Sequence, residues 1–317
     1  MNRRGFRIIL VLGLAAVAVG LCISLTSSHK EEAVLPDGRV QLRLNEALTN
    51  EISDTSALTG MDTKIQSYMR QWGLHGASLA IMRNDSLVYA KGYGWADEEK
   101  HVKMQPSNIL RVASVSKLLT AAGIMLLQDQ GKLNIKDTVF GPRGILTDTT
   151  YTSVMKDPNY KKITIEDLLR HKGGFTSYGG DPMFSTRTIM QTNHLDTPPD
   201  NTELMRIMLR RRLRFVPGTS QYYSNFGYLL LSKVIEEVSG QPYEEFMQKN
   251  VLEPAGCYDM HIAENYYKDK RKNEVRYYNG ADTCLVDEFN NSGNMVERCY
   301  GGSDIHSLSG AGAWVCS

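Results

Sequence analysis

A serine and a lysine three residues apart carry the clearest sign of chemistry in this 317-residue sequence. Ser114 and Lys117 lie in a stretch, 111–122, that has helical character and contains neither Gly nor Pro. Residues three apart share one face of a helix, so the Lys117 amine can reach the Ser114 hydroxyl. The positive end of a helix dipole disfavours the ammonium and favours an alkoxide. The spacing therefore predicts a serine nucleophile with a lysine base, although S-x-x-K also occurs by chance as a solvated pair.

A second polar pair follows about a hundred residues later, at Tyr223 and Asn225. It stands just before a strongly helical segment, 229–238, that Gly240 ends. If both side chains project into one cleft, the phenol can relay a proton and the amide can orient a substrate carbonyl. The alternative is structural, with Tyr223 packed in the core and Asn225 capping a helix.

The elements that must position these residues can be read from periodicity. An amphipathic helix spans about 58–72, with an apolar face made by Leu58, Met61, Ile65, Met69 and Trp72. Two strand-like runs, 77–83 and 87–93, flank a turn signal at 84–86 and predict a hairpin. Further helices are expected to begin near Ser114, Thr164 and Thr202. This order predicts an α+β protein in which helices cover an antiparallel sheet.

The N-terminal segment predicts export. Residues 1–7 carry three cations and no anion, and the run from Ile8 to about Leu25 is apolar and uncharged. We expect 1–28 to be a signal peptide or an N-terminal membrane anchor, with the remainder outside the cytoplasm, periplasmic or facing outward from the membrane. Cys22 admits lipidation or a buried membrane cysteine. The polar residues 29–56 are expected to form a tether before a domain at 57–317.

Composition excludes some partners and constrains the cysteines. The net charge is +1, which gives no basic surface for nucleic acid, and we expect no metal and no cofactor. Four cysteines follow the N-terminal segment, and an oxidising compartment permits one or two disulfides. Cys284 and Cys299 bracket a polar segment and form the favoured pair, although three pairings are formally open. The other two are Cys257 and Cys316.

Taken together, the two motifs give the chain a broad resemblance to the serine β-lactamase and penicillin-binding protein superfamily. It is similar to class C β-lactamases and their D-alanyl-D-alanine carboxypeptidase and esterase relatives from about Leu74 onward. Supporting segments are Gly92-Tyr93-Gly94, 111–117, Leu168 to Gly174, and Phe215 to Gly218. The resemblance implies an antiparallel sheet flanked by helices plus an all-helical lobe.

The resemblance also implies roles for the four polar residues. Ser114 would be the acylated nucleophile, with its backbone N–H as one oxyanion donor. Lys117 would accept its proton, Tyr223 would serve the leaving group as acid and base, and Asn225 would contact the substrate amide. The implied substrates are β-lactams, D-Ala-D-Ala peptides derived from peptidoglycan, or esters. A non-catalytic, membrane-tethered binding or sensor protein of the same fold is the alternative.

One motif of the superfamily is not found where the resemblance places it. A K-T-G or H-x-G string, with the second oxyanion donor, is expected well after Tyr223. The H-x-G string of this chain, His171-Lys172-Gly173, precedes Tyr223, so we assign it no part in the active site. We therefore expect the sequence to be truncated at its C-terminus, where Gly310 to Ser317 resembles an entry to a further helix.

Overall fold

The computed structural model describes residues 33–34, 40–41, 48–53, 59–177, 180–279 and 284–317. The chain divides into two compact units, 1–43 and 44–317. In the first unit β1 (Ala33–Val34) and β2 (Val40–Gln41) pair antiparallel. The predicted signal or anchor at 1–28, including Cys22, lies outside the described residues. Within the described ranges, no helix has the length and apolarity to cross a membrane.

The predicted hairpin forms in the second unit. Strand β3 (Gly76–Arg83) pairs antiparallel with β4 (Ser86–Asp97), and β5 (Val102–Lys103) pairs with the other edge of β4. Asn84 and Asp85 both have positive φ angles, 47° and 59°. Positive φ at both central residues is the conformation that a two-residue hairpin turn requires, and Asn and Asp tolerate it.

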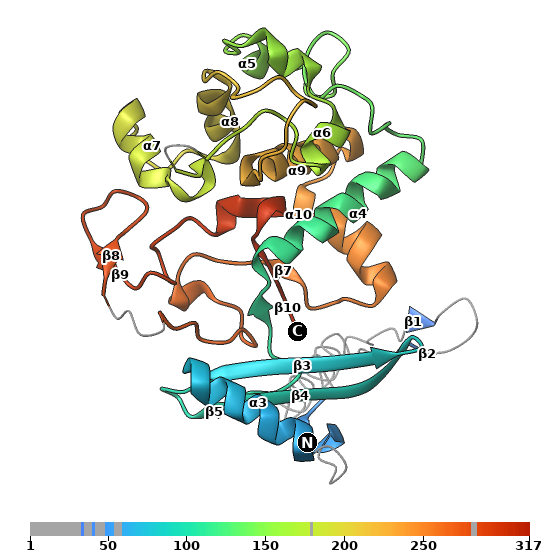
Figure 1. Cartoon of the computed structure of the whole chain (residues 1–317), viewed down its shortest axis with the longest axis vertical. Helices are drawn as coiled ribbons and strands as arrows, with labels where there is room; N and C mark the ends of the chain where they lie inside the picture. The colour runs from blue at the N-terminus through green and yellow to red at the C-terminus, as the bar shows by residue number, and fades with distance from the viewer. Residues whose placement is uncertain (1–32, 35–39, 42–47, 54–58, 178–179, 280–283) are drawn as a thin grey trace, which may run out of the picture. The chain divides into compact units, whose positions relative to one another are not determined.

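Helix α3 (Thr59–Trp72) joins this sheet mainly through one carboxylate (Figure 1). Asp62 accepts hydrogen bonds from the Tyr89 and Tyr93 hydroxyls, at 2.9 and 2.7 Å, and pairs with Lys91 at 3.0 Å. Met69 is buried as predicted, but Trp72 is 62% exposed, so its assignment to the inward face was wrong. Trp72 instead lies 6.2 Å from the ring of Tyr68, which is also exposed.

The end of the expected tether packs on the same sheet. Residues Asn50–Ser53 form a short 3-10 helix, η1. Ser53 Oγ donates to the Ala90 carbonyl at 2.7 Å, and Asn50 Oδ1 accepts from the Gly92 N–H at 2.8 Å. Residues 50–53 are therefore part of the fold and not a free linker.

A helical lobe surrounds α9 (Asn225–Ser239), the helix that follows the Tyr223 loop (Figure 1). The consecutive side chains of Leu229, Leu230 and Leu231 are fully buried, because α4, α6 and α10 pack on different sides of α9. The other helices of the lobe are α4 (Ser116–Asp129), α5 (Thr149–Thr152), α6 (Ile165–Leu169), α7 (Thr186–Asn193), α8 (Asn201–Leu209) and α10 (Tyr243–Met247).

A second small sheet contains the strand that precedes α4 in the chain. Its order is β6 (Leu110–Arg111), β10 (Trp314–Cys316) and β7 (His261–Ile262), all antiparallel. Val315 pairs with Arg111 on one side and His261 on the other. The remaining elements are η3 (Ala113–Val115), η4 (Pro158–Lys162), η5 (Pro182–Phe184), the π-helical η6 (Gln248–Leu252), η7 (Glu253–Ala255), η8 (Tyr267–Asp269), β8 (Val286–Asp287), β9 (Met295–Val296) and η9 (His306–Ala311).

The architecture confirms the predicted α+β class with a helical lobe. It departs from the expectation in how the strands are grouped, because the described strands of the second unit form separate small antiparallel sheets. The pairing of β4 with β5 shifts register between Trp95 and Asp97, and the chain then turns away before β6. This irregularity ends the first sheet at β5.

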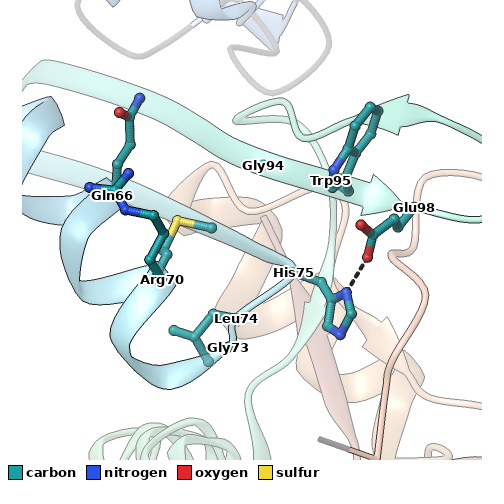
Figure 2. A pocket seen from close by; sticks show the side chains of 9 residues that line it. Gln66, Arg70, Gly73, Leu74, His75, Gly94, Trp95 and Glu98 are labelled. Atoms are coloured by element: carbon teal, nitrogen blue, oxygen red, sulfur yellow. Dashed lines mark hydrogen bonds and ion pairs between the residues drawn. The ribbon is translucent and has the colours of Figure 1, made fainter.

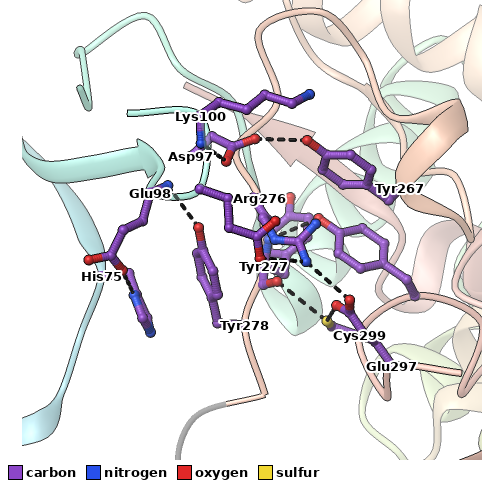
Figure 3. A network of polar contacts seen from close by, with 12 residues as sticks. His75, Asp97, Glu98, Lys100, Tyr267, Arg276, Tyr277, Tyr278, Glu297 and Cys299 are labelled. Atoms are coloured by element: carbon purple, nitrogen blue, oxygen red, sulfur yellow. Dashed lines mark hydrogen bonds and ion pairs between the residues drawn. The ribbon is translucent and has the colours of Figure 1, made fainter. Parts of the chain in front are cut away.

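A polar network ties Tyr267 and residues 276–278 to the end of β4 (Figure 3). The Tyr267 hydroxyl donates to Asp97 Oδ2 at 2.8 Å, and the Glu98 N–H donates to the Tyr278 hydroxyl at 2.8 Å. Arg276 pairs with Glu99 at 3.0 Å. Because Asp97 is the last residue of β4 and Glu98 and Glu99 follow it, these contacts hold Tyr267 and residues 276–278 against the end of that strand.

The same network overturns the favoured disulfide. Cys299 is a free thiol whose Sγ donates to the Tyr277 carbonyl at 3.4 Å, so the expected Cys284–Cys299 bridge is not formed. Cys257 and Cys316 are also free thiols. Polar flanking sequence cannot establish a bridge, because a disulfide requires the two Cα atoms to lie within about 7 Å of each other.

Candidate active site

Ser114 lies on a short 3-10 turn that leads directly into α4. The Val112 N–H donates to the Trp314 carbonyl at 3.0 Å, which holds the approach to the turn on β10. Ala113 then has φ +46°, a left-handed conformation that is uncommon for alanine. Strained backbone of this kind is often found at functional sites. The turn leaves Ser114 exposed while Lys117, one turn later, is buried at 7% exposure.

The Lys117 amine is surrounded by three uncharged oxygens. It lies 3.2 Å from Ser114 Oγ and 2.7 Å from Asn225 Oδ1, and it also contacts the Ala311 carbonyl. The amine is therefore close enough to the Ser114 hydroxyl to exchange a proton with it, while the other two oxygens hold the amine in place.

Asn225 is held from both ends of its amide. Its Nδ2 donates to Asp181 Oδ2 at 2.7 Å while its Oδ1 accepts from Lys117 at 2.7 Å. A carboxylate can only accept, so the Asp181 partner fixes which way the amide points. Ser224, not Asn225, caps α9, since its Oγ accepts from the Gly227 N–H at 3.1 Å.

Tyr223 completes the group from the opposite side. Its hydroxyl lies 2.6 Å from Ser114 Oγ, and its ring lies 4.8 Å from the Lys117 amine. The side chain is 48% exposed, so it is not the core residue of the structural alternative. Hydrogen bonds thus link the four predicted site residues in the order Tyr223, Ser114, Lys117, Asn225, with Tyr223 on the solvent side and Lys117 on the buried side.

A buried layer beneath the site fixes the Ala311 carbonyl. Thr120 Oγ1 donates to the Gly310 carbonyl at 2.8 Å and contacts the Tyr243 hydroxyl at 2.8 Å. A Cβ on Gly310 would lie 2.6 Å from Thr120 Oγ1, so this approach requires glycine. Ser309 has φ 45° and ψ −127°, a conformation that reverses the chain just before the carbonyl reaches Lys117.

Two hollows among the described residues have linings that do not include Ser114. One, of about 430 Å³, is open and lies at the end of α3, where His75 hydrogen-bonds Glu98 (Figure 2). A second, of about 350 Å³, includes Cys257 and Cys316 in its lining. In the first, the lining includes an imidazole and a carboxylate but no hydroxyl or thiol that could act as nucleophile. Among the described residues, no cluster of three or more His, Cys, Asp or Glu could hold a metal ion.

Sequence reasoning missed three participants in the site. Asp181 lies 44 positions before Asn225, and Ala311 contributes only a backbone carbonyl. His171 belongs to the H-x-G string set apart from the active site, yet its ring centroid lies 4.6 Å from that of Tyr223. A single carboxylate in a loop belongs to no periodic pattern, and a backbone carbonyl does not depend on residue type. Of the three, only His171 belonged to a sequence motif that could have indicated the site.

The chain is similar to known proteins in sequence and in fold. A model of the Beta-lactamase family matches residues 61–316. PbpX of Bacillus subtilis, a candidate penicillin-binding protein, is 27% identical over 85% of this chain and 63% of its own length. Protein flp of Staphylococcus aureus is 27% identical over 66% of this chain and 39% of its own length. The chain thus spans less than two thirds of the curated relatives it matches.

Solved structures give the same result. The octameric penicillin-binding protein homologue of Pyrococcus abyssi superimposes with a TM-score of 0.59 and 25% identity, over 82% of this chain and 53% of the other. The D-amino acid amidase of Ochrobactrum anthropi shares the fold with a TM-score of 0.60 and 21% identity, over 83% and 67%. With a family match that covers most of its length and a matching fold, the chain belongs to the Beta-lactamase family.

Proposed function

We propose that the protein is a serine hydrolase that opens an amide, β-lactam or ester through an acyl-enzyme on Ser114. The observation that carries the proposal is the position of Ser114 Oγ, 3.2 Å from the Lys117 amine and 2.6 Å from the Tyr223 hydroxyl. A hydroxyl becomes a useful nucleophile when a positioned base removes its proton. Here one candidate base is buried and the other faces solvent.

The proposed acylation follows from these contacts. Lys117 takes the Ser114 proton while Oγ bonds to the substrate carbonyl carbon. The carbon–nitrogen or carbon–oxygen bond then breaks, and Tyr223 gives a proton to the leaving atom. Proton transfer between Lys117 and Tyr223 restores both groups. Water next attacks the acyl carbon, releases the acid and returns the proton to Ser114.

Asn225 and Asp181 are proposed to orient the substrate. The Asn225 Nδ2 carries two hydrogens, and Asp181 uses one of them. The second hydrogen is available for a substrate carbonyl. The proposed substrate classes are β-lactams, peptides that end in D-Ala-D-Ala, and esters, and relatives named as penicillin-binding proteins and amidases support an acyl-transfer site.

Incubation with a fluorescent penicillin and a cephalosporin, followed by intact-protein mass spectrometry, tests the proposal. We expect an adduct on Ser114 or hydrolysis of the drug, lost in Ser114→Ala and retained in Ser153→Ala, a control on an ordinary serine. An adduct that persists indicates slow deacylation, while hydrolysis without an adduct indicates a β-lactamase. If neither drug nor any simple ester reacts, the non-catalytic binding or sensor function is the better description.

Export is proposed from the N-terminal sequence alone. Three cations followed by an apolar run support a signal peptide or anchor, which would place the domain in the periplasm or outside the membrane. Fractionation of cells that express the full chain tests this, with N-terminal sequencing to detect cleavage near residue 28. Recovery of the full-length chain in the soluble cytoplasmic fraction would refute it.

A further inference from the structure

His171 holds both main-chain neighbours of Tyr223. The Tyr222 N–H donates to the His171 carbonyl at 2.8 Å, and the Ser224 N–H donates to His171 Nδ1 at 3.3 Å. These two donors flank Tyr223 in the chain. One residue from the end of α6 therefore fixes the backbone on each side of the phenol.

The imidazole also packs on the Tyr223 ring itself. The two ring centroids are 4.6 Å apart, and the Tyr228 ring lies 5.2 Å away on the same imidazole. The Lys117 amine lies 4.8 Å from the centre of the Tyr223 ring. Tyr223 is thus in contact with His171 and with Lys117, and its hydroxyl is left to reach Ser114.

We propose that His171 is a positioning residue for Tyr223 and that it acts as the neutral imidazole. This inference rests on the proposed function, because it concerns the orientation of the proposed proton donor. The Ser224 N–H needs an acceptor at Nδ1, so the ring proton must be on Nε2. A protonated ring would offer an N–H to the Ser224 N–H and add a second positive charge beside Lys117.

The surroundings favour the neutral form. Among the described residues, the titratable groups found around the imidazole are Lys117 on α4, through its charge, and the phenols of Tyr223 and Tyr228, through ring contacts. Burial and then the charge of Lys117 lower the pKa of His171 below its ordinary value of 6.5. The neutral, acceptor form is thus present at neutral pH and is lost as the pH falls through this lowered pKa.

The backbone supplies a matched pair of variants. His171 has φ +57°, and His194, exposed at the end of α7, has φ +54°. Asparagine tolerates this left-handed conformation and does not titrate. His171→Asn therefore removes the imidazole without adding backbone strain. His194→Asn makes the same change in the same backbone conformation, at a residue for which no contact with Tyr223 is observed.

The test is the pH profile of kcat/KM for ester or β-lactam turnover by the full chain. We expect the profiles of wild type and His194→Asn to show an acid limb, a fall in kcat/KM as the pH drops through the His171 pKa. In His171→Asn this acid limb should disappear, and activity at pH 7.5 should fall because the ring contact with Tyr223 is lost. An acid limb that keeps its midpoint in His171→Asn overturns the proposal.

A second readout needs no turnover. The NMR signals of the Tyr223 ring, assigned by their loss in Tyr223→Phe, should shift in His171→Asn and stay in place in His194→Asn. In wild type they should also change with pH at the His171 midpoint. If wild type turns over nothing, the proposed function fails while these signals still decide the positioning role. Tyr223 signals unchanged by His171→Asn overturn it.

Discussion

Replacement of Lys117 by methionine should separate catalysis from stability. Methionine has a similar length but carries neither a charge nor a hydrogen-bond donor. If Lys117 is the base, acylation should slow by about 10²- to 10⁴-fold, the usual contribution of general base catalysis. That range corresponds to about 2.7 to 5.5 kcal/mol in the activation barrier. The penicillin-acylation rate constant of the full chain is the direct measurement.

The effect on folding should be smaller because two terms oppose each other. The variant leaves the Asn225 Oδ1 and Ala311 oxygens without their buried donor, which costs about 1 to 3 kcal/mol for each group left unsatisfied. It also removes the cost of burying a polar amine that is only 7% exposed. We expect a change in the free energy of unfolding of no more than a few kcal/mol in either direction.

The control is Lys132→Met, an exposed lysine just after the end of α4. It should alter neither acylation nor the free energy of unfolding by more than about 0.5 kcal/mol. Acylation of Lys117→Met within tenfold of wild type, with Ser114→Ala inactive, would refute the assignment of the base. If Tyr223→Phe then lost 100-fold or more, the phenol would be the base.

Three further changes test the surroundings of the site. Asp181→Ala should slow acylation at least tenfold, because a charged hydrogen bond worth about 1.5 to 3 kcal/mol no longer fixes the Asn225 amide, while the exposed Asp196→Ala should match wild type. Gly92→Ala should cost about 1 to 3 kcal/mol in urea unfolding, since its Cβ would lie 2.6 Å from the Met104 backbone; Gly60→Ala, which meets no atom within 4 Å, should cost nothing. Burial raises the pKa of Cys316 to about 11 from 9.0, so iodoacetamide at pH 8 should label it about 100-fold more slowly than an ordinary thiol; equal rates in folded and unfolded protein would contradict this.

Local patterns predicted what depends on neighbours in sequence. The three-residue spacing of Ser114 and Lys117 is set by helix geometry, and the turn at Asn84 and Asp85 is set by residue types that accept positive φ. The meeting of these motifs with Tyr223 and Asn225 followed from a family resemblance rather than from spacing. Ser114 and Tyr223 are 109 residues apart in the sequence, and the packing of α4 on α9 brings them together.

The sequence predictions that were wrong or missing all concern which group a side chain contacts in the folded protein. Trp72 continues the apolar period of α3, but the sheet contacts the helix mainly through Asp62 and Met69 and leaves Trp72 in solvent. Cys299 has a polar flanking sequence suited to a bridge, but the Tyr277 carbonyl takes its thiol hydrogen. Asp181 could be assigned to the site only from its hydrogen bond with Asn225 in the structure. Periodicity gives a direction to a side chain but does not give its partner.

The difference in exposure between Lys117 and Tyr223 assigns their proposed tasks. Both lie within reach of the Ser114 hydroxyl, so distance alone does not tell them apart. Lys117 is 7% exposed and its amine lies within hydrogen-bonding distance of three neutral oxygens, so it is shielded from water. Tyr223 is 48% exposed, so its hydroxyl can meet the leaving group of an incoming substrate. We therefore infer that Lys117 serves the nucleophile and Tyr223 serves the leaving group, which requires His171 to keep the phenol in place.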